Sequence, residues 1–126
     1  AQARAQQLHA DRLLDDLADR GLLERTLVVV MGEIGRTPKI NGGAGRDHWE
    51  HCYTVLFAGG GARGGLVHGA SDRHGAYPSR CPVSASDIVA TIYDALGISP
   101  SLELHDQLGR PMTLVPDGTP VREVFG

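Results

Sequence analysis

The chain lacks the features of membrane-spanning and nucleic-acid-binding proteins. Its longest strongly apolar run, from Leu27 to Met31, is far shorter than the roughly 20 residues that a membrane-spanning helix needs. Its 12 basic and 15 acidic side chains are interspersed without a basic block, and Lys39 is the only lysine. The composition therefore argues against a transmembrane segment and against nucleic acid as a main partner.

Cysteine is also scarce. The chain has only Cys52 and Cys81, and their spacing does not match a zinc-binding pattern. They could form one disulfide bond or remain two buried free thiols. We favour the free thiols because unpaired cysteine is among the most often buried residue types.

The 126 residues, of which 41% are hydrophobic, are enough for one domain with its own core. The N-terminal segment AQARAQQLHADRLLDDL has no apolar core of a signal peptide and reads as the middle of a helix. We therefore expect either a single α/β domain over residues 1–126 or the C-terminal part of a larger one. In the second case the upstream part of the parent chain is a partner. Apolar faces left uncovered without it would favour homo-oligomers.

Two segments have the apolar spacing of helices. Residues 3–20 carry an apolar stripe at helical spacing. Ser84 and Asp87 have the spacing of a capping box at the start of a second helix, which Gly97 is expected to end.

Two further segments have the pattern of buried strands. Residues 26–31 and 53–58 are apolar runs without alternation, which is typical of strands covered on both faces. Together with the helices they predict an α/β fold, a layered and mostly parallel sheet with flanking helices. Residues 100–126 are rich in proline and glycine and are expected to form an irregular tail with short strands at most.

The loop between the predicted strands collects polar side chains, namely Glu33, Arg36, Arg46, Asp47, His48 and His51. In layered α/β sheets ligands bind beyond the carboxyl ends of strands, and this loop starts at such an end. Carboxylate and imidazole groups are ligands for zinc and other divalent ions. Guanidinium groups bind phosphate or sulfate through two parallel hydrogen bonds. The loop is therefore a candidate metal and anion site.

Each of these residues also has a structural interpretation. Glu33 could cap a neighbouring helix, and Arg36 and Arg46 could pair with carboxylates of the same loop. An Asp-His pair is a weak signal by itself, since a solvated loop histidine is the commoner case. The residues alone leave these alternatives open.

Three motifs resemble the C-terminal half of alkaline phosphatase and sulfatase-like proteins, and most closely a bacterial family named only as domain of unknown function 1501. They are MGEIGRTP at 31–38, GRDHW at 45–49 and AGGGARGG at 58–65. The resemblance covers nearly the whole chain, and the motifs are specific together rather than singly.

The resemblance implies a metal site. In the superfamily a buried strand ends in an Asp-His pair followed by glycine, and both side chains bind metal. The matching tetrapeptide here is GEIG, with Glu33 at the aspartate position and Ile34, which cannot bind metal, at the histidine position. His48 lies about where a further histidine ligand belongs, and Asp47 or His51 would replace it in another register. The implied ion is divalent, with zinc favoured over manganese, magnesium or calcium.

The resemblance also implies an activity, the metal-dependent hydrolysis of phosphate or sulfate esters, with Arg36 or Arg46 on a small anionic substrate. The nucleophile and the earlier ligands of such enzymes would lie upstream, and none is identified in this chain. The alternative is a non-catalytic secreted relative that serves as a binding or structural module. Relatives of this kind are usually exported, so a periplasmic or secreted parent protein is expected.

Overall fold

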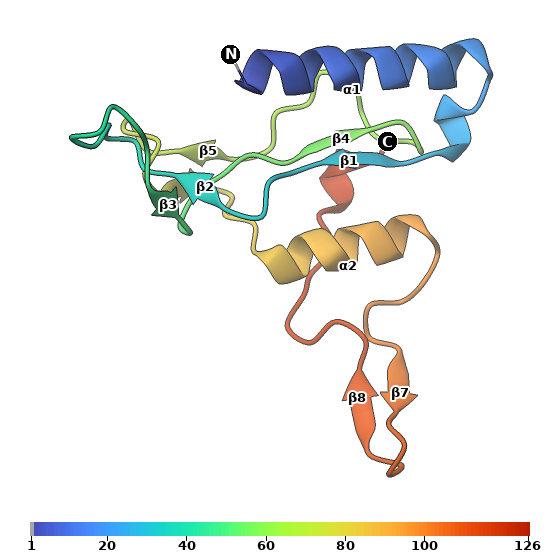
Figure 1. Ribbon diagram of the computed structural model, residues 1–126. Helices are drawn as coiled ribbons and strands as arrows, with labels where there is room; N and C mark the ends of the chain where they lie inside the picture. Colours follow the sequence, from blue (N-terminus) through green and yellow to red (C-terminus); the bar gives the residue numbers. More distant parts are fainter. Residues whose placement is uncertain (1) are drawn as a thin grey trace. The chain divides into compact units, whose positions relative to one another are not determined.

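The computed structural model describes residues 2–126 of the chain and the side chains of residues 10–126. The elements of this part are two α-helices, two short 3₁₀ helices and eight strands of two or three residues (Figure 1). The chain divides into two compact units. Unit 1 runs to Arg80 and includes Val124–Gly126, and unit 2 is Cys81–Glu123. None of the described helices combines the length and the apolar character that crossing a membrane requires.

Unit 1 begins with the predicted helix, α1 at Gln2–Asp19. Gly21 ends the helix in the left-handed conformation, with φ 66°. The N–H of Leu22 donates to the carbonyl of Leu17 over 2.8 Å, as in a glycine-based helix stop. A 3₁₀ turn, η1 at Leu23–Arg25, follows and leads into the first strand.

The expectation of a layered, mostly parallel sheet is wrong. The two predicted strands exist as β1 (Val28–Val30) and β4 (Leu56–Ala58), but they pair antiparallel, with Val29 opposite Phe57. The described strands form four separate two-stranded sheets, each of them antiparallel.

The connection between β1 and β4 explains the antiparallel pairing. The crossover between parallel neighbours is usually a helix, whereas this connection, residues 31–55, contains only the short strands β2 (Gly35–Arg36) and β3 (His48–Trp49). The apolar runs also mislead about burial, because Val30 and Leu56 are 38% and 46% exposed. Unalternated β-branched residues therefore do not indicate a doubly covered strand here.

A glycine turn follows β4 and closes unit 1. Gly59 and Gly60 have φ of 66° and 57°, and a Cβ on Gly59 would lie 2.6 Å from the carbonyl oxygen of Leu23. The turn therefore needs glycine for its backbone conformation and for its close approach to η1. Phe125 returns to this region, forming an antiparallel bridge with Ala62 and an edge-to-face contact with Phe57.

The remaining strands of unit 1 are β5 (Ala70–Ser71) and β6 (Pro78–Arg80), which pair around a turn organised by Asp72. One carboxylate oxygen of Asp72 accepts hydrogen bonds from the N–H groups of Ala76 and His74, each over 2.9 Å. These bonds, led by the one from Ala76, lower the pKa of Asp72.

Unit 2 is organised around α2 (Ala85–Ala95), which confirms the second predicted helix. The capping box forms as expected, with the Asp87 N–H donating to Ser84 Oγ and the Ser84 N–H donating to Asp87. Gly97 ends the helix with φ 74°. The buried residues of unit 2 are Ile88, Ala90 and Thr91 of α2, together with Val115 from the later chain.

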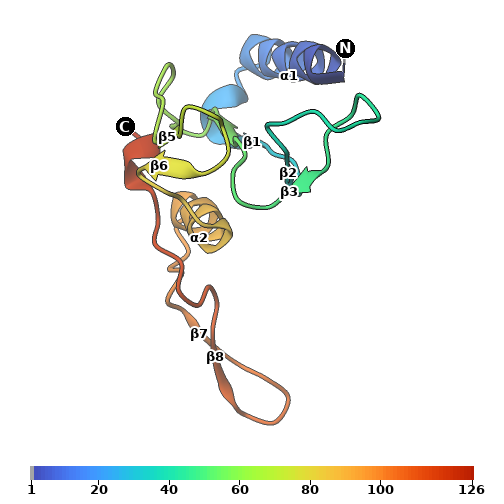
Figure 2. The same ribbon diagram turned by 90° about the vertical axis from the view of Figure 1, so that its left-hand side faces the viewer.

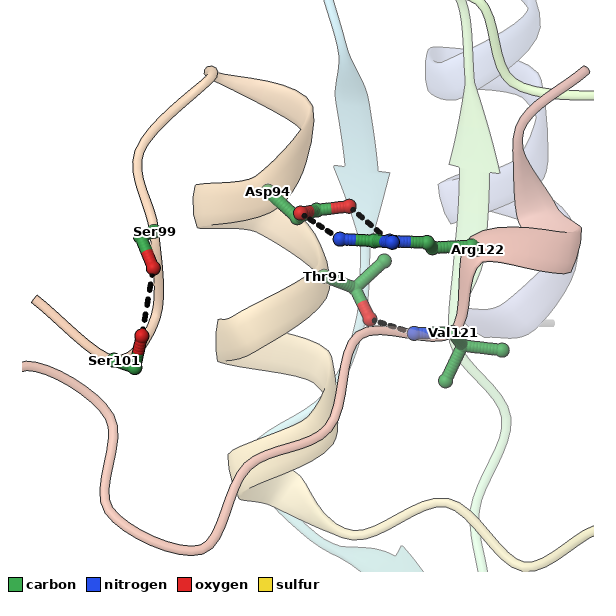
Figure 3. A network of polar contacts seen from close by, with 6 residues as sticks. All are labelled: Thr91, Asp94, Ser99, Ser101, Val121 and Arg122. Carbon is green, nitrogen blue, oxygen red and sulfur yellow. Dashed lines mark hydrogen bonds and ion pairs between the residues drawn. The ribbon is translucent and has the colours of Figure 1, made fainter.

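Residues 119–122 are held to α2 by polar contacts along its length. Asp87 Oδ1 accepts from the Thr119 N–H over 2.8 Å. Thr91 Oγ1 accepts from the Val121 N–H over 2.9 Å, and Arg122 forms two parallel hydrogen bonds with Asp94 over 3.0 and 3.1 Å (Figure 3). These contacts hold the chain against α2 as far as the first residue of η2 (Arg122–Val124).

Between α2 and this segment the chain forms a hairpin of β7 (Glu103–His105) and β8 (Pro111–Thr113), which extends away from α2 (Figures 1 and 2). Both cysteines are free thiols, as favoured from the sequence, but neither is buried as expected: Cys52 is partly exposed and Cys81 is exposed.

The Thr91 hydroxyl makes a testable contribution to unit 2. We expect Thr91→Val to lower the free energy of unfolding by about 1–3 kcal/mol, because the part-buried Val121 N–H loses its acceptor. Urea unfolding followed by far-UV circular dichroism measures the change. Thr91→Ser keeps the hydroxyl and should lose less. A valine variant as stable as the wild type would contradict this role.

Candidate functional site

The predicted site loop folds into the hairpin formed by β2 and β3. Gly35 lies opposite Trp49, and Arg36 lies opposite His48. Gly35 is buried, and a Cβ there would meet the carbonyl oxygen of Cys52 and lie 2.7 Å from that of Trp49. Only glycine lets the strand after Glu33 pass this close to the turn after Trp49, so Gly35 determines where Arg36 and His48 lie.

The tip of the hairpin is organised by Asn41, which sequence reasoning did not identify. Its Oδ1 accepts from the N–H groups of Gly43 and Gly45, each over 3.0 Å, and its Nδ2 donates to Asp47 over 2.8 Å. Asparagine followed by two glycines is a known turn signal, because the asparagine side chain bonds to backbone two residues further on. The sequence thus contained this turn signal, but the signal indicates a local turn rather than a catalytic or binding role.

Two of the six candidate residues are engaged in holding this loop together. Arg46 Nη1 donates to the carbonyls of Thr37 and Pro38, each over 2.8 Å. Asp47 accepts from Asn41 through its side chain, and its backbone exchanges hydrogen bonds with Thr37. Both side chains therefore have structural contacts, and both remain exposed.

Arg36 and His48 form a different kind of pair. They are direct cross-strand partners, so their side chains project from the same face of the hairpin. Both are exposed, and neither makes a side-chain hydrogen bond to the part of the protein with described side chains. Glu33, in the bend between β1 and β2, is also exposed and makes no hydrogen bond to a described side chain. These three residues leave their polar groups available to a ligand.

His51 belongs to an aromatic cluster with Trp49 and Tyr77. Its ring centroid lies 4.7 Å from that of Trp49 and 5.0 Å from that of Tyr77. The Trp49 indole N–H donates to the Ala76 carbonyl over 2.6 Å, which joins the hairpin to the Asp72 turn. Sequence reasoning missed Tyr77 because nothing in its neighbourhood links it to the distant loop. Trp49, the single tryptophan, is half-buried, and its contacts position the hairpin.

The candidate metal ligands do not assemble into a metal centre by themselves. Among the residues that the structure describes, no three His, Cys, Asp or Glu side chains come together in a group that could hold a metal ion. Structural and catalytic zinc sites use three or four protein ligands. Glu33, Asp47, His48 and His51 therefore provide part of a donor set at most.

Comparison with known proteins gives a family and no further relative. The sequence matches the family described as "Protein of unknown function (DUF1501)" over residues 2–125. Comparisons with curated proteins and with solved structures find no match. Because the match extends over nearly the whole chain, the protein belongs to the DUF1501 family.

Proposed function

We propose that the chain is part of a metal-dependent hydrolase of phosphate or sulfate esters, related to alkaline phosphatases and sulfatases. Arg36 contacts the anionic ester, and Glu33 and His48 serve as ligands of a divalent ion, with zinc favoured. The single observation that carries the proposal is the pairing of Arg36 and His48 on one exposed face of the β2–β3 hairpin. The resemblance of GEIG and GRDHW to the motifs of those enzymes supports it.

The chemistry of this face suits an anion with several oxygens. The planar guanidinium of Arg36 can donate two parallel hydrogen bonds to phosphate or sulfate. His48 can donate a further bond or bind a metal ion, depending on its protonation. Arg46 and Asp47 contribute indirectly, because their contacts with Thr37 and Asn41 keep the loop in shape. Neither Arg36 nor His48 needs to break a contact with a described side chain in order to bind.

The proposal assigns the missing parts of the site to residues beyond this set. The described donors are too few for a complete centre, so the remaining ligands and the nucleophile come from an upstream part of a longer parent chain. No step of the reaction is assigned to a residue of this chain beyond holding the ester and the ion. The proposal also includes a periplasmic or secreted parent protein, which rests on the resemblance alone.

The first test measures metal binding by the 126-residue chain with isothermal titration calorimetry, using zinc and manganese chlorides. We expect weak zinc binding, and Glu33→Gln and His48→Ala should each weaken it about tenfold or more. His105→Ala is the matched control, because His105 is an exposed histidine of unit 2. Zinc binding that is unchanged in both site variants would contradict the assignment of ligands.

The second test measures activity, with p-nitrophenyl phosphate and p-nitrophenyl sulfate as substrates and the parent protein as enzyme. Arg36→Lys should raise KM more than it lowers kcat, because lysine keeps the charge but loses the two parallel hydrogen bonds. A parent that hydrolyses neither ester at any metal concentration would contradict the proposed activity.

A non-catalytic binding or structural module is the second candidate. Ile34 favours it, because the resemblance puts this half-buried side chain at the position of a ligand, and isoleucine cannot bind metal. The same reading follows if the parent binds zinc through Glu33 and His48 but turns over neither ester. Metal content and turnover therefore separate the two candidates.

A further inference from the structure

Asn41, the only asparagine of the chain, is followed directly by Gly42 at the tip of the hairpin of β2 and β3. Asparagine is one of the thermally labile residues, because the backbone nitrogen that follows it can attack its side-chain carbonyl carbon. Glycine hinders this attack least, since it has no Cβ and allows the widest range of backbone conformations. The Asn-Gly pair therefore makes the tip of the hairpin chemically labile.

The attacking group is the backbone nitrogen of Gly42, and the fold leaves it free. Among the hydrogen bonds of the described residues, none has the Gly42 N–H as its donor, although the next three N–H groups, of residues 43–45, all have acceptors. Gly42 is exposed, and a Cβ placed on it would meet no atom within 4 Å. Hydroxide can therefore reach this N–H, and no contact holds the nitrogen away from the side chain of Asn41.

The side chain of Asn41 is held in an orientation that favours the attack. Its Oδ1 lies 3.0 Å from the nitrogens of Gly43 and Gly45, so the side chain folds back along the backbone that follows it. Both N–H groups donate to the oxygen on which negative charge develops when Cγ is attacked, as the donors of an oxyanion hole do. The amide nitrogen Nδ2 donates to Asp47 over 2.8 Å, which fixes the plane of the amide.

We propose that Asn41 is a site of spontaneous deamidation in the folded chain. Hydroxide removes the proton of the Gly42 nitrogen, which forms a bond to Asn41 Cγ. The bond from Cγ to Nδ2 breaks, and Nδ2 takes a proton from water and leaves as ammonia, so that a five-membered succinimide ring remains. Water then opens the ring at one of its two carbonyls, which gives aspartate or isoaspartate. Water is the only co-reactant, and no electrons are exchanged with another molecule.

Either product changes the contacts that shape the hairpin. The new carboxylate cannot donate to Asp47, whose Oδ1 lies 2.8 Å from the amide nitrogen, so a hydrogen bond is replaced by repulsion between two negative charges. Isoaspartate also lengthens the backbone by one carbon, which disturbs the hydrogen bonds from Gly43 and Gly45. Asp47 directly precedes His48, the cross-strand partner of Arg36. Deamidation therefore loosens the face that these two residues share, whatever that face binds.

The first test follows the mass of the full chain during incubation at neutral pH, with a synthetic peptide of residues 37–49 as the reference. Peptide mapping should locate a change from amide to acid at residue 41, on the same time scale in the folded chain as in the peptide. Gly42→Ala is the matched variant, because its methyl group meets no atom of the fold but hinders the attack. It should slow the conversion several-fold.

Two results of this test would overturn the proposal. A folded chain that keeps its amide after the peptide has been converted would show that the fold protects Asn41. A conversion as fast in Gly42→Ala as in the wild type would exclude attack by the Gly42 nitrogen. Neither result depends on ester hydrolysis or metal binding, so this test is separate from those of the proposed function.

The second test measures the effect on the hairpin, because Asn41→Asp reproduces one of the two products. Its urea midpoint, followed by Trp49 fluorescence, should lie below that of the wild type. Asn41→Asp combined with Asp47→Asn should recover the midpoint, since the exchanged pair again places one amide opposite one carboxylate. An Asn41→Asp variant as stable as the wild type, or a double variant without recovery, would refute the proposed effect on the hairpin.

Discussion

We expect Gly35→Ala to lower the free energy of unfolding of unit 1 by about 2–4 kcal/mol, the largest effect of any single methyl group added to this hairpin. The added Cβ would collide with the carbonyl oxygen of Cys52 and stand 2.7 Å from that of Trp49. Both obstacles are backbone, so they cannot move aside as a flexible side chain would. The strand must shift instead, and the Arg36–His48 pair shifts with it.

Trp49 reports this change directly, because it is the only tryptophan and lies across from Gly35. The urea midpoint followed by Trp49 fluorescence should fall in Gly35→Ala. Gly42→Ala is the matched control, since a Cβ at Gly42 meets no atom within 4 Å and its φ is not in the left-handed region. Equal midpoints for the two variants would show that the close approach at Gly35 does not constrain the hairpin.

Asp87→Asn should destabilise unit 2 at neutral pH by about 1–2 kcal/mol, the usual worth of a helix cap. One carboxylate accepts from the Ser84 N–H and hydroxyl over 2.8 and 2.7 Å, and from the Thr119 N–H over 2.8 Å. Asparagine keeps one acceptor oxygen but loses the charge, and with it the stronger form of these bonds. The helical signal at 222 nm measures the loss by urea unfolding.

The same carboxylate gives a defined pH dependence. The Thr119 N–H, followed by the Ser84 hydroxyl and N–H, lowers the pKa of Asp87 in the folded chain. The unfolded chain, with a pKa of about 3.9, therefore binds the proton first as the pH falls. The stabilisation is complete above about pH 5 and is lost as the pH falls through the folded pKa.

Stability measured from about pH 6 to 3 should accordingly fall less steeply in Asp87→Asn than in the wild type. Asp72 and Asp106 also have lowered pKa values, so part of the acid sensitivity remains. Asp117→Asn is the matched control, because Asp117 is exposed and its left-handed backbone suits asparagine. If the stability of Asp87→Asn falls with pH as steeply as that of the wild type, then Asp87 does not contribute to acid unfolding.

Local signals in the sequence predicted local structure well. The glycines at 21 and 97 and the Ser84–Asp87 capping box correctly predicted where helices begin or end. Each of these depends on backbone geometry within a few residues, which residue type controls directly. The positions of the two strands were also predicted. The antiparallel pairing of β1 with β4 was not, because it depends on the connection between them, about which the pattern of either strand alone gives no information.

The sequence predicted which residues belong to the candidate site better than it predicted how they are arranged. The loop does place Arg36 and His48 on one face. The sequence did not distinguish these exposed residues from Arg46 and Asp47, which bond within the loop, because all four are charged or polar residues of one segment. Asn41 and Gly35 determine which of these side chains bond within the loop and which stay exposed, although neither residue is itself a candidate ligand or catalytic residue.

The return of Phe125 to Ala62 has a consequence for synthesis on the ribosome. Unit 2 is contained within unit 1 along the chain, since the chain leaves unit 1 after Arg80 and re-enters it at Val124. The Arg63 N–H finds its acceptor only on Val124, over 2.8 Å, and Phe57 meets its aromatic neighbour only when Phe125 has been made. Unit 1, although its first part is translated before unit 2, therefore makes its final pairing only after the whole of unit 2 has been synthesised.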